Sequence, residues 1–136
     1  MAWNLHVQDG RLRLIDFQDA LLGPDTYDLA ALLTDRTTGT LVDPALESAL
    51  VAYFVDARAR AGLPTTGDVP ARVRACALHR ALKVIGRFYF LERVKGKPGY
   101  LAYLPSVYAA ARRCFAATPA WRDVQTLVAA HVPELG

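Results

Sequence analysis

The residues best suited to chemistry are three closely spaced aspartates near the start of the 136-residue sequence. Asp16 ends a short apolar segment, Asp19 follows three residues later, and Asp25 comes directly after a Gly-Pro turn. A strand end is a common place for a reactive carboxylate, because the backbone is fixed there while the side chain leaves the sheet. Hard divalent cations such as Mg²⁺ prefer carboxylate oxygens. Asp16 is therefore the leading candidate for a metal ligand, the alternative being an aspartate that only caps the following turn.

Asn4 and His6 lie on a segment that we expect to pair with the strand ending in this carboxylate. Residues 4–8 and 11–16 alternate polar and apolar side chains around Asp9-Gly10, which is a strong hairpin signal. A two-residue turn brings Asn4 opposite the end of the second strand, and His6 shares a face with Asn4 by alternation. His6 is then either a nitrogen ligand or general base beside the metal, or an ordinary surface histidine.

Two sequence runs carry a resemblance to a known family: Leu-Ile-Asp-Phe-Gln-Asp-Ala at residues 14–20 and Tyr-Asp-Leu-Ala at residues 27–30. They resemble the metal-binding segment of the aminoglycoside phosphotransferase and choline kinase superfamily, and are most similar to the bacterial kinases of N-acetylmuramate and N-acetylglucosamine. The resemblance implies that Asp16 chelates the divalent ions that bridge nucleotide phosphates, and that Asn4 supplies a second metal contact. Asp19 is either a further ligand or a turn residue. The implied cofactor is a divalent metal, namely Mg²⁺, Mn²⁺ or Zn²⁺.

In that family a catalytic loop of the form His-x-Asp-x-x-x-x-Asn precedes this strand, and Asn4 matches its final residue. The catalytic Asp would stand five residues earlier, which falls before Met1. Asp28 matches an aspartate that holds this loop by its amides. The sequence therefore resembles a truncated C-terminal lobe of a kinase-like phosphotransferase, without the N-lobe, the phosphate clamp and the catalytic base. We expect no ATP-dependent sugar kinase activity from it alone.

Two functional hypotheses follow. In the first, an ion held by Asp16 with Asn4, His6 or Asp19 polarises a phosphoryl oxygen and lowers the pKa of its bound water to roughly 7, so that the protein is a weak hydrolase of activated phosphoesters. In the second, the chain is a non-catalytic kinase fragment that is stabilised by self-association. Dependence on a metal distinguishes the two, because only the first requires it.

The elements expected to position these residues are one β-hairpin and a helical body on which the apolar face of the hairpin packs. Asp43 and Asp68 are expected to cap two of the helices, and Asp25 the first. The predicted helices span residues 27–36, 44–62, 69–94, 100–117 and 120–131, the fourth with a bend near Pro105. The expected fold class is mainly α with one β-hairpin. We expect a single domain over residues 1–136, in which residues 1–22 form the hairpin and metal-binding segment and residues 23–136 form the helical body.

Composition restricts the partners. A hydrophobic fraction of 53% is high for a domain of this size and predicts an apolar surface that associates, so a homo-oligomer is expected. The net charge of +3 suits a phosphate-bearing small molecule, and the basic residues lack the aromatic interleaving of nucleic-acid binders. The sequence contains neither a signal-peptide pattern nor an apolar run of transmembrane length, which predicts a cytoplasmic protein without a membrane partner. Cys76 and Cys114 are expected to be buried thiols.

Overall fold

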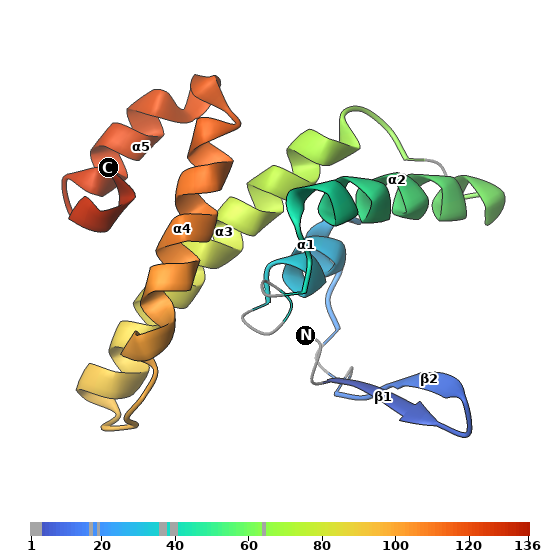
Figure 1. Ribbon diagram of the computed structural model, residues 1–136, viewed down its shortest axis with the longest axis horizontal. Helices are drawn as coiled ribbons and strands as arrows, with labels where there is room; N and C mark the ends of the chain where they lie inside the picture. Colours follow the sequence, from blue (N-terminus) through green and yellow to red (C-terminus); the bar gives the residue numbers. More distant parts are fainter. Residues whose placement is uncertain (1–3, 17, 19, 36–37, 39–40, 64) are drawn as a thin grey trace. The chain divides into compact units, whose positions relative to one another are not determined.

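The computed structural model describes the chain except for residues 1–3, 17, 19, 36–37, 39–40 and 64 (Figure 1). It forms one β-hairpin followed by helices, which confirms the predicted fold class. The residues group into two compact units, 1–73 and 74–136. The boundary between the units falls inside the longest helix, α3 (Val69–Tyr89).

The hairpin consists of β1 (Leu5–Gln8) and β2 (Arg11–Leu14), which pair in an antiparallel register. Its two turn residues, Asp9 and Gly10, have φ values of 51° and 68°. Positive φ at both central positions is the condition for the tight turn whose twist matches that of the strands, and aspartate and glycine are among the residues that tolerate it. The Asp-Gly pair therefore fixes the register, as the sequence predicted.

One face of the hairpin carries only apolar side chains, and it is exposed. Leu5 pairs with Leu14 and Val7 with Leu12, so the four share a face as the alternation predicts. The expectation that this face packs on the helical body is wrong, because Val7, Leu12 and Leu14 are 77%, 66% and 59% exposed. Alternation determines which side chains share a face, but not what covers that face.

The first unit also contains α1 (Tyr27–Leu33) and α2 (Pro44–Arg60). The Asp43 side chain accepts a hydrogen bond from the amide of Leu46 at 2.8 Å, and Asp68 accepts one from the amide of Ala71 at 2.9 Å. Both predicted N-caps of α2 and α3 are thereby confirmed. The buried apolar residues of this unit are Ala30, Ala31, Leu33, Val51, Val69 and Val73.

In the second unit α3 ends at Tyr89 and is followed by a π-helical turn, η2 (Phe90–Val94). The next helix begins as a 3₁₀ turn, η3 (Leu101–Tyr103), and continues as α4 (Leu104–Ala116). The predicted helix changes from 3₁₀ to α immediately before Pro105, which lies in the first turn of α4, where proline costs no hydrogen bond. The Glu92 carboxylate accepts a hydrogen bond from the amide of Leu101 at 2.9 Å, which closes the corner between the two helices.

The chain continues through η4 (Pro119–Trp121), α5 (Arg122–Ala129) and a final 3₁₀ turn, η5 (Pro133–Leu135). The core of this unit contains Cys76, Ala77, Leu78, Ala81, Ile85, Leu104, Tyr108, Ala111, Cys114, Phe115 and Leu135. Both cysteines are buried, as predicted. Within the described part of the chain, none of the helices has the length and apolar character needed to cross a membrane.

Candidate functional site

Asn4 and Asp16 are in contact where the hairpin ends. The amide of Ile15 donates to the carbonyl of Asn4 at 3.0 Å, which extends the strand pairing beyond Leu5. The Asn4 Nδ2 then donates to Asp16 Oδ2 at 3.0 Å, and Gln18 Nε2 donates to Asp16 Oδ1 at 2.9 Å. Each carboxylate oxygen accepts one amide hydrogen and keeps a free lone pair. The two side-chain amides therefore orient an exposed carboxylate that is still able to bind a cation.

The backbone of Asp16 is in the left-handed region, with φ of 60°. Outside glycine this conformation is uncommon and costs on the order of 1 kcal/mol, although aspartate tolerates it better than most residues. It turns the chain out of the β2 direction immediately after Ile15, where the carboxylate accepts the hydrogen bond from Asn4. Backbone strain of this kind is concentrated at functional sites.

The side chains at this position fit Mg²⁺ better than Zn²⁺. Among the described residues, no three His, Cys, Asp or Glu side chains are close enough to share one metal ion. In the described part of this segment, the donors that contact one another are the Asp16 carboxylate and the side-chain amides of Asn4 and Gln18. Mg²⁺ is commonly held by one or two carboxylates, with waters and substrate phosphates in the remaining positions, whereas Zn²⁺ prefers nitrogen and sulfur. A half-turn of the Asn4 amide exchanges Nδ2 for Oδ1 and presents two protein oxygens to one ion.

The other two predicted site residues are not part of this contact. His6 lies opposite Arg13 in the ladder, not opposite the end of the second strand where Asn4 contacts Asp16. The guanidinium group of Arg13 also makes this part of the hairpin unfavourable for a cation. Asp19 lies outside the described residues. The structure thus brings Asn4 and Asp16 together, adds Gln18, and leaves His6 apart.

Asp25 has a role that the sequence did not reveal. Its carboxylate lies 3.6 Å from Arg58 Nη2 and 3.3 Å from Arg72 Nη2, with side chains 26–32% exposed. The predicted capping role is wrong, because Thr26 occupies the N-cap of α1 and makes no side-chain capping bond. Arg58 lies in the last turn of α2 and Arg72 in the first turn of α3, so Asp25 joins the start of α1 to both. An ion pair between residues so far apart in sequence leaves no local pattern.

We expect Asp25→Ala to destabilise the first unit. The substitution leaves two neighbouring guanidinium groups without their shared carboxylate, and about 1–2 kcal/mol is expected for a partly exposed pair of this kind. Urea unfolding of both proteins measures the change. Asp28→Asn removes the same charge from an exposed position of α1 and should change stability by less than about 0.5 kcal/mol. Equal stabilities of Asp25→Ala and wild type would show that the ion pairs contribute nothing.

Comparison with known proteins agrees with these features. Residues 1–64, which include the hairpin, Asn4 and Asp16, match the phosphotransferase enzyme family. By this match, residues 1–64 of the chain belong to the family. It is 33% identical over 132 residues to the N-acetylmuramate/N-acetylglucosamine kinase of Pseudomonas aeruginosa, and the match covers 95% of this chain and 38% of that kinase.

Other kinases of the same name give similar matches. That of Pseudomonas putida is 34% identical over 119 residues, covering 85% of this chain and 34% of the kinase. That of Caulobacter vibrioides is 32% identical over 136 residues, and the match covers 98% of this chain and 35% of the kinase. This chain therefore spans about a third of the length of the curated relatives that it matches. No solved structure gives a significant match. The similarity confirms the resemblance inferred from residues 14–20 and 27–30, and the metal-binding roles stay predictions.

Proposed function

We propose that this chain carries the magnesium-binding part of a phosphoryl-transfer site, centred on Asp16. The observation that supports it best is the 3.0 Å contact between Asn4 and Asp16, in a segment that matches the phosphotransferase family. When bound, Mg²⁺ neutralises the charge on phosphate oxygens and aligns them for transfer. Asp16 supplies the negative charge that attracts the ion, while Asn4 and Gln18 fix the direction of the carboxylate oxygens.

The names of the relatives indicate the substrate class. We take N-acetylated amino sugars as the acceptors, and a nucleoside triphosphate as the donor, of the complete kinase to which this part corresponds. Transfer also needs a base for the acceptor hydroxyl and a cationic clamp for the donor phosphates. The 136 residues contain no His-x-Asp-x-x-x-x-Asn pattern. We therefore assign to these 136 residues the binding of the metal–phosphate complex, and not the activation of the sugar.

The proposal is tested by locating the metal site in solution. Mn²⁺, which replaces Mg²⁺ at oxygen sites, is added with ATP to isotopically labelled protein, and its broadening of amide NMR signals is measured. We expect the strongest broadening around Asn4 and in residues 14–18, because paramagnetic broadening falls steeply with distance. Broadening that is spread evenly over exposed carboxylates, or centred on Asp43 or Asp68, would contradict the proposal.

We expect no ATP-dependent phosphorylation of N-acetylmuramate, N-acetylglucosamine or an aminoglycoside by this 136-residue protein. Nearly all catalysis in this class comes from positioning and electrostatic clamping, and a displacement of about 1 Å can already cost roughly 100-fold. Transfer of labelled γ-phosphate to each sugar is measured with a full-length relative as the positive control. Transfer above the background of a protein-free sample would overturn the expectation.

A weaker activity could still depend on the same site. An ion bound to Asp16 would lower the pKa of its water and allow slow hydrolysis of an activated phosphoester, such as p-nitrophenyl phosphate. Asp19 remains a candidate group to assist this reaction, whereas His6, which lies opposite Arg13, is expected to contribute little. The hypothesis depends entirely on the metal, so its sharpest test is the removal of the carboxylate charge.

A second candidate function is that of a non-catalytic, self-associating fragment. The observation that favours it is the apolar face of the hairpin, on which Val7, Leu12 and Leu14 are exposed and Leu5 is half-buried. Leu21 and Leu22 continue the apolar character along the chain at 93% and 106% exposure. An isolated two-stranded hairpin is only marginally stable, and burial of such a face would stabilise it. A second copy of the chain offers an identical face for this purpose.

A further inference from the structure

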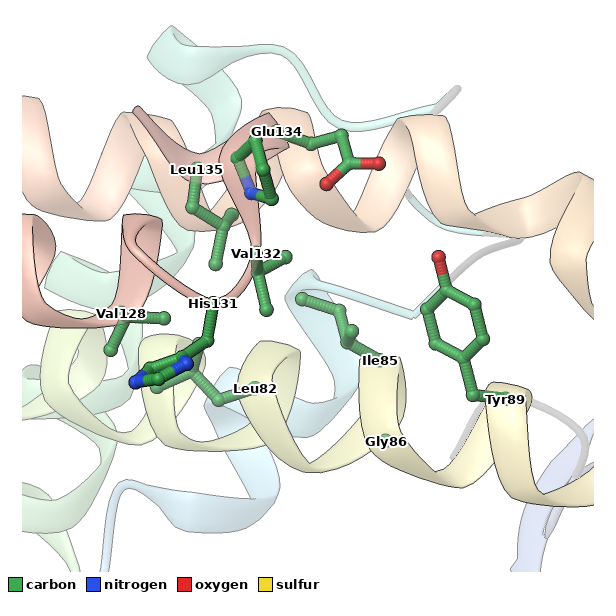
Figure 2. A pocket seen from close by; sticks show the side chains of 10 residues that line it. Leu82, Ile85, Gly86, Tyr89, Val128, His131, Val132, Glu134 and Leu135 are labelled. Atoms are coloured by element: carbon green, nitrogen blue, oxygen red, sulfur yellow. The ribbon is translucent and has the colours of Figure 1, made fainter.

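A cavity of about 620 Å³ lies wholly within the unit of residues 74–136 and shares no residue with the Asn4–Asp16 pair. Its wall is formed by α3 on one side and by the segment from α5 to η5 on the other (Figure 2). Binding sites for small molecules commonly have volumes of about 300–1,000 Å³ and a mainly apolar lining with a few polar groups. This cavity has both properties.

The floor of the cavity is apolar and contains a position without a side chain. Ile85 and Leu135 are 5% and 0% exposed, and both contribute to the lining together with Leu82. Gly86 also lines the cavity, and a Cβ added to it would meet no heavy atom within 4 Å. Glycine is unfavourable in a helix interior because of its backbone entropy. At this exposed position of the lining, a side chain would extend into open space beside the cavity wall.

Polar groups gather at one end of the cavity. The Tyr89 and Tyr108 hydroxyl oxygens are 3.2 Å apart, and Tyr108 is buried. Burial raises the pKa of the Tyr108 hydroxyl far above its ordinary value, and the hydrogen bond to Tyr89 and the negative charge of Glu134 act in the same direction. Tyr108 therefore stays protonated. Figure 2 shows the Glu134 carboxylate and the Tyr89 hydroxyl toward the same end, with the His131 ring toward the other.

This polar end accepts hydrogen bonds and carries negative charge. Among the described residues, neither a lysine nor an arginine contributes to the lining. Arg112, which is close by, donates to the backbone carbonyl of Glu134. The Glu134 carboxylate is thus available to a ligand, and it accepts hydrogen bonds but cannot donate them when ionised. A phosphate or carboxylate ligand would meet repulsion at this position.

We propose that the cavity binds a small amphipathic cation, consisting of an apolar ring or short chain with one ammonium group. The apolar part lies on Leu82, Ile85 and Leu135, in the space left by Gly86. The ammonium group donates to the Glu134 carboxylate and to the oxygen of Tyr89. This site lies beyond the phosphoryl-transfer site proposed above and does not depend on it, because it needs neither metal nor nucleotide.

The test uses three probes that share one ring and chain and differ only in the head group: 3-phenylpropylamine, 3-phenylpropanol and 3-phenylpropionate. Each is titrated into the labelled 136-residue protein without metal, and amide shifts are followed by NMR. We expect the amine to bind with a dissociation constant on the order of 1 mM, with shifts in residues 82–89 and 128–135. The alcohol should bind about fivefold more weakly, and the carboxylate should not saturate.

Two substitutions and one control separate the apolar and polar contributions to binding. Gly86→Leu fills the cavity with a residue that favours helix, and should weaken the binding of both the amine and the alcohol at least tenfold. Ala75→Leu, at an exposed position of the same helix, should leave both unchanged. Glu134→Gln, at an exposed side chain, should lower the affinity for the amine to that for the alcohol, and should leave the affinity for the alcohol unchanged.

Binding of the amine with the expected affinity and head-group preference supports the proposal, and other results contradict it. The proposal is overturned if no probe binds at a concentration about tenfold above the expected dissociation constant. It is also overturned if the carboxylate binds as tightly as the amine, or if Glu134→Gln does not change the affinity for the amine. Retained binding in Gly86→Leu, with a circular dichroism spectrum like that of wild type, would place the probe elsewhere. If that variant does not fold, Glu134→Gln and the three head groups still decide the question.

Discussion

Asp16→Asn is expected to lower metal-dependent hydrolysis of p-nitrophenyl phosphate by at least about 100-fold. The substitution keeps the shape of the side chain, but it removes the negative charge and replaces one oxygen by an NH₂ group that repels a cation. A loss of roughly 3 kcal/mol of charge stabilisation at a metal site corresponds to about this factor. Asp16 is the carboxylate that the Asn4 and Gln18 amides orient, so no other described side chain replaces it in place.

The measurement compares initial rates in saturating Mg²⁺ with those after exhaustive treatment with EDTA. Asp28→Asn is the matched control, because it removes the same charge from an exposed position of the same unit and should retain the wild-type rate. His6→Ala should change the rate less than Asp16→Asn, since His6 lies opposite Arg13. Equal rates for wild type and Asp16→Asn, or full activity in EDTA, would place the chemistry elsewhere and refute the metal-site hypothesis.

The second large effect concerns assembly. We expect the protein to be a dimer or larger at high micromolar concentration, and Leu12→Lys to convert it to a monomer. Leu12 is 66% exposed and lies opposite Val7 at the centre of the apolar face of the hairpin. A lysine placed there would bring two like charges into a two-fold interface and would leave them without water.

Light scattering coupled to gel filtration gives the mass of each species. Gln8→Lys adds the same charge to the opposite face of the hairpin, because Gln8 pairs with Arg11 rather than with an apolar residue. This control should remain associated. A wild-type mass of 14.9 kDa across the concentration range would exclude self-association, and dissociation of both variants would show that the added charge acts without regard to the face.

The parts of the fold that follow from local interactions could be predicted from the sequence. The Asp9-Gly10 turn determines the register, and the register in turn places Asn4 beside Asp16. Asp43 and Asp68 are recognisable as caps because capping needs only the side chain and amides two or three residues further along. The central contact of the candidate site therefore follows from interactions between residues that are close in the sequence.

The parts that depend on distant residues could not be predicted. Asp25 pairs with Arg58 and Arg72, and no local pattern distinguishes these arginines from the others. The exposure of the hairpin face depends on what the rest of the chain offers as a cover, and alternation carries no information about that. The cavity beside Gly86 arises where the end of the chain meets the C-terminal part of α3, and the sequence shows there only a glycine within a helical pattern.

The left-handed backbone at Asp16 has a consequence for how this site can lose its function. Glycine adopts this conformation without the Cβ penalty, so the local backbone energy would favour glycine there by up to about 1 kcal/mol. The carboxylate is exposed and makes hydrogen bonds only to two exposed or half-exposed amides, so its removal costs the fold little. A variant without the acid would be as robust as the parent in a melting curve, and would be classed as harmless by any screen for folding. At this position the backbone conformation favours glycine, whereas metal binding requires the carboxylate. Only a measurement of cation binding can therefore distinguish a functional variant from an inactive one.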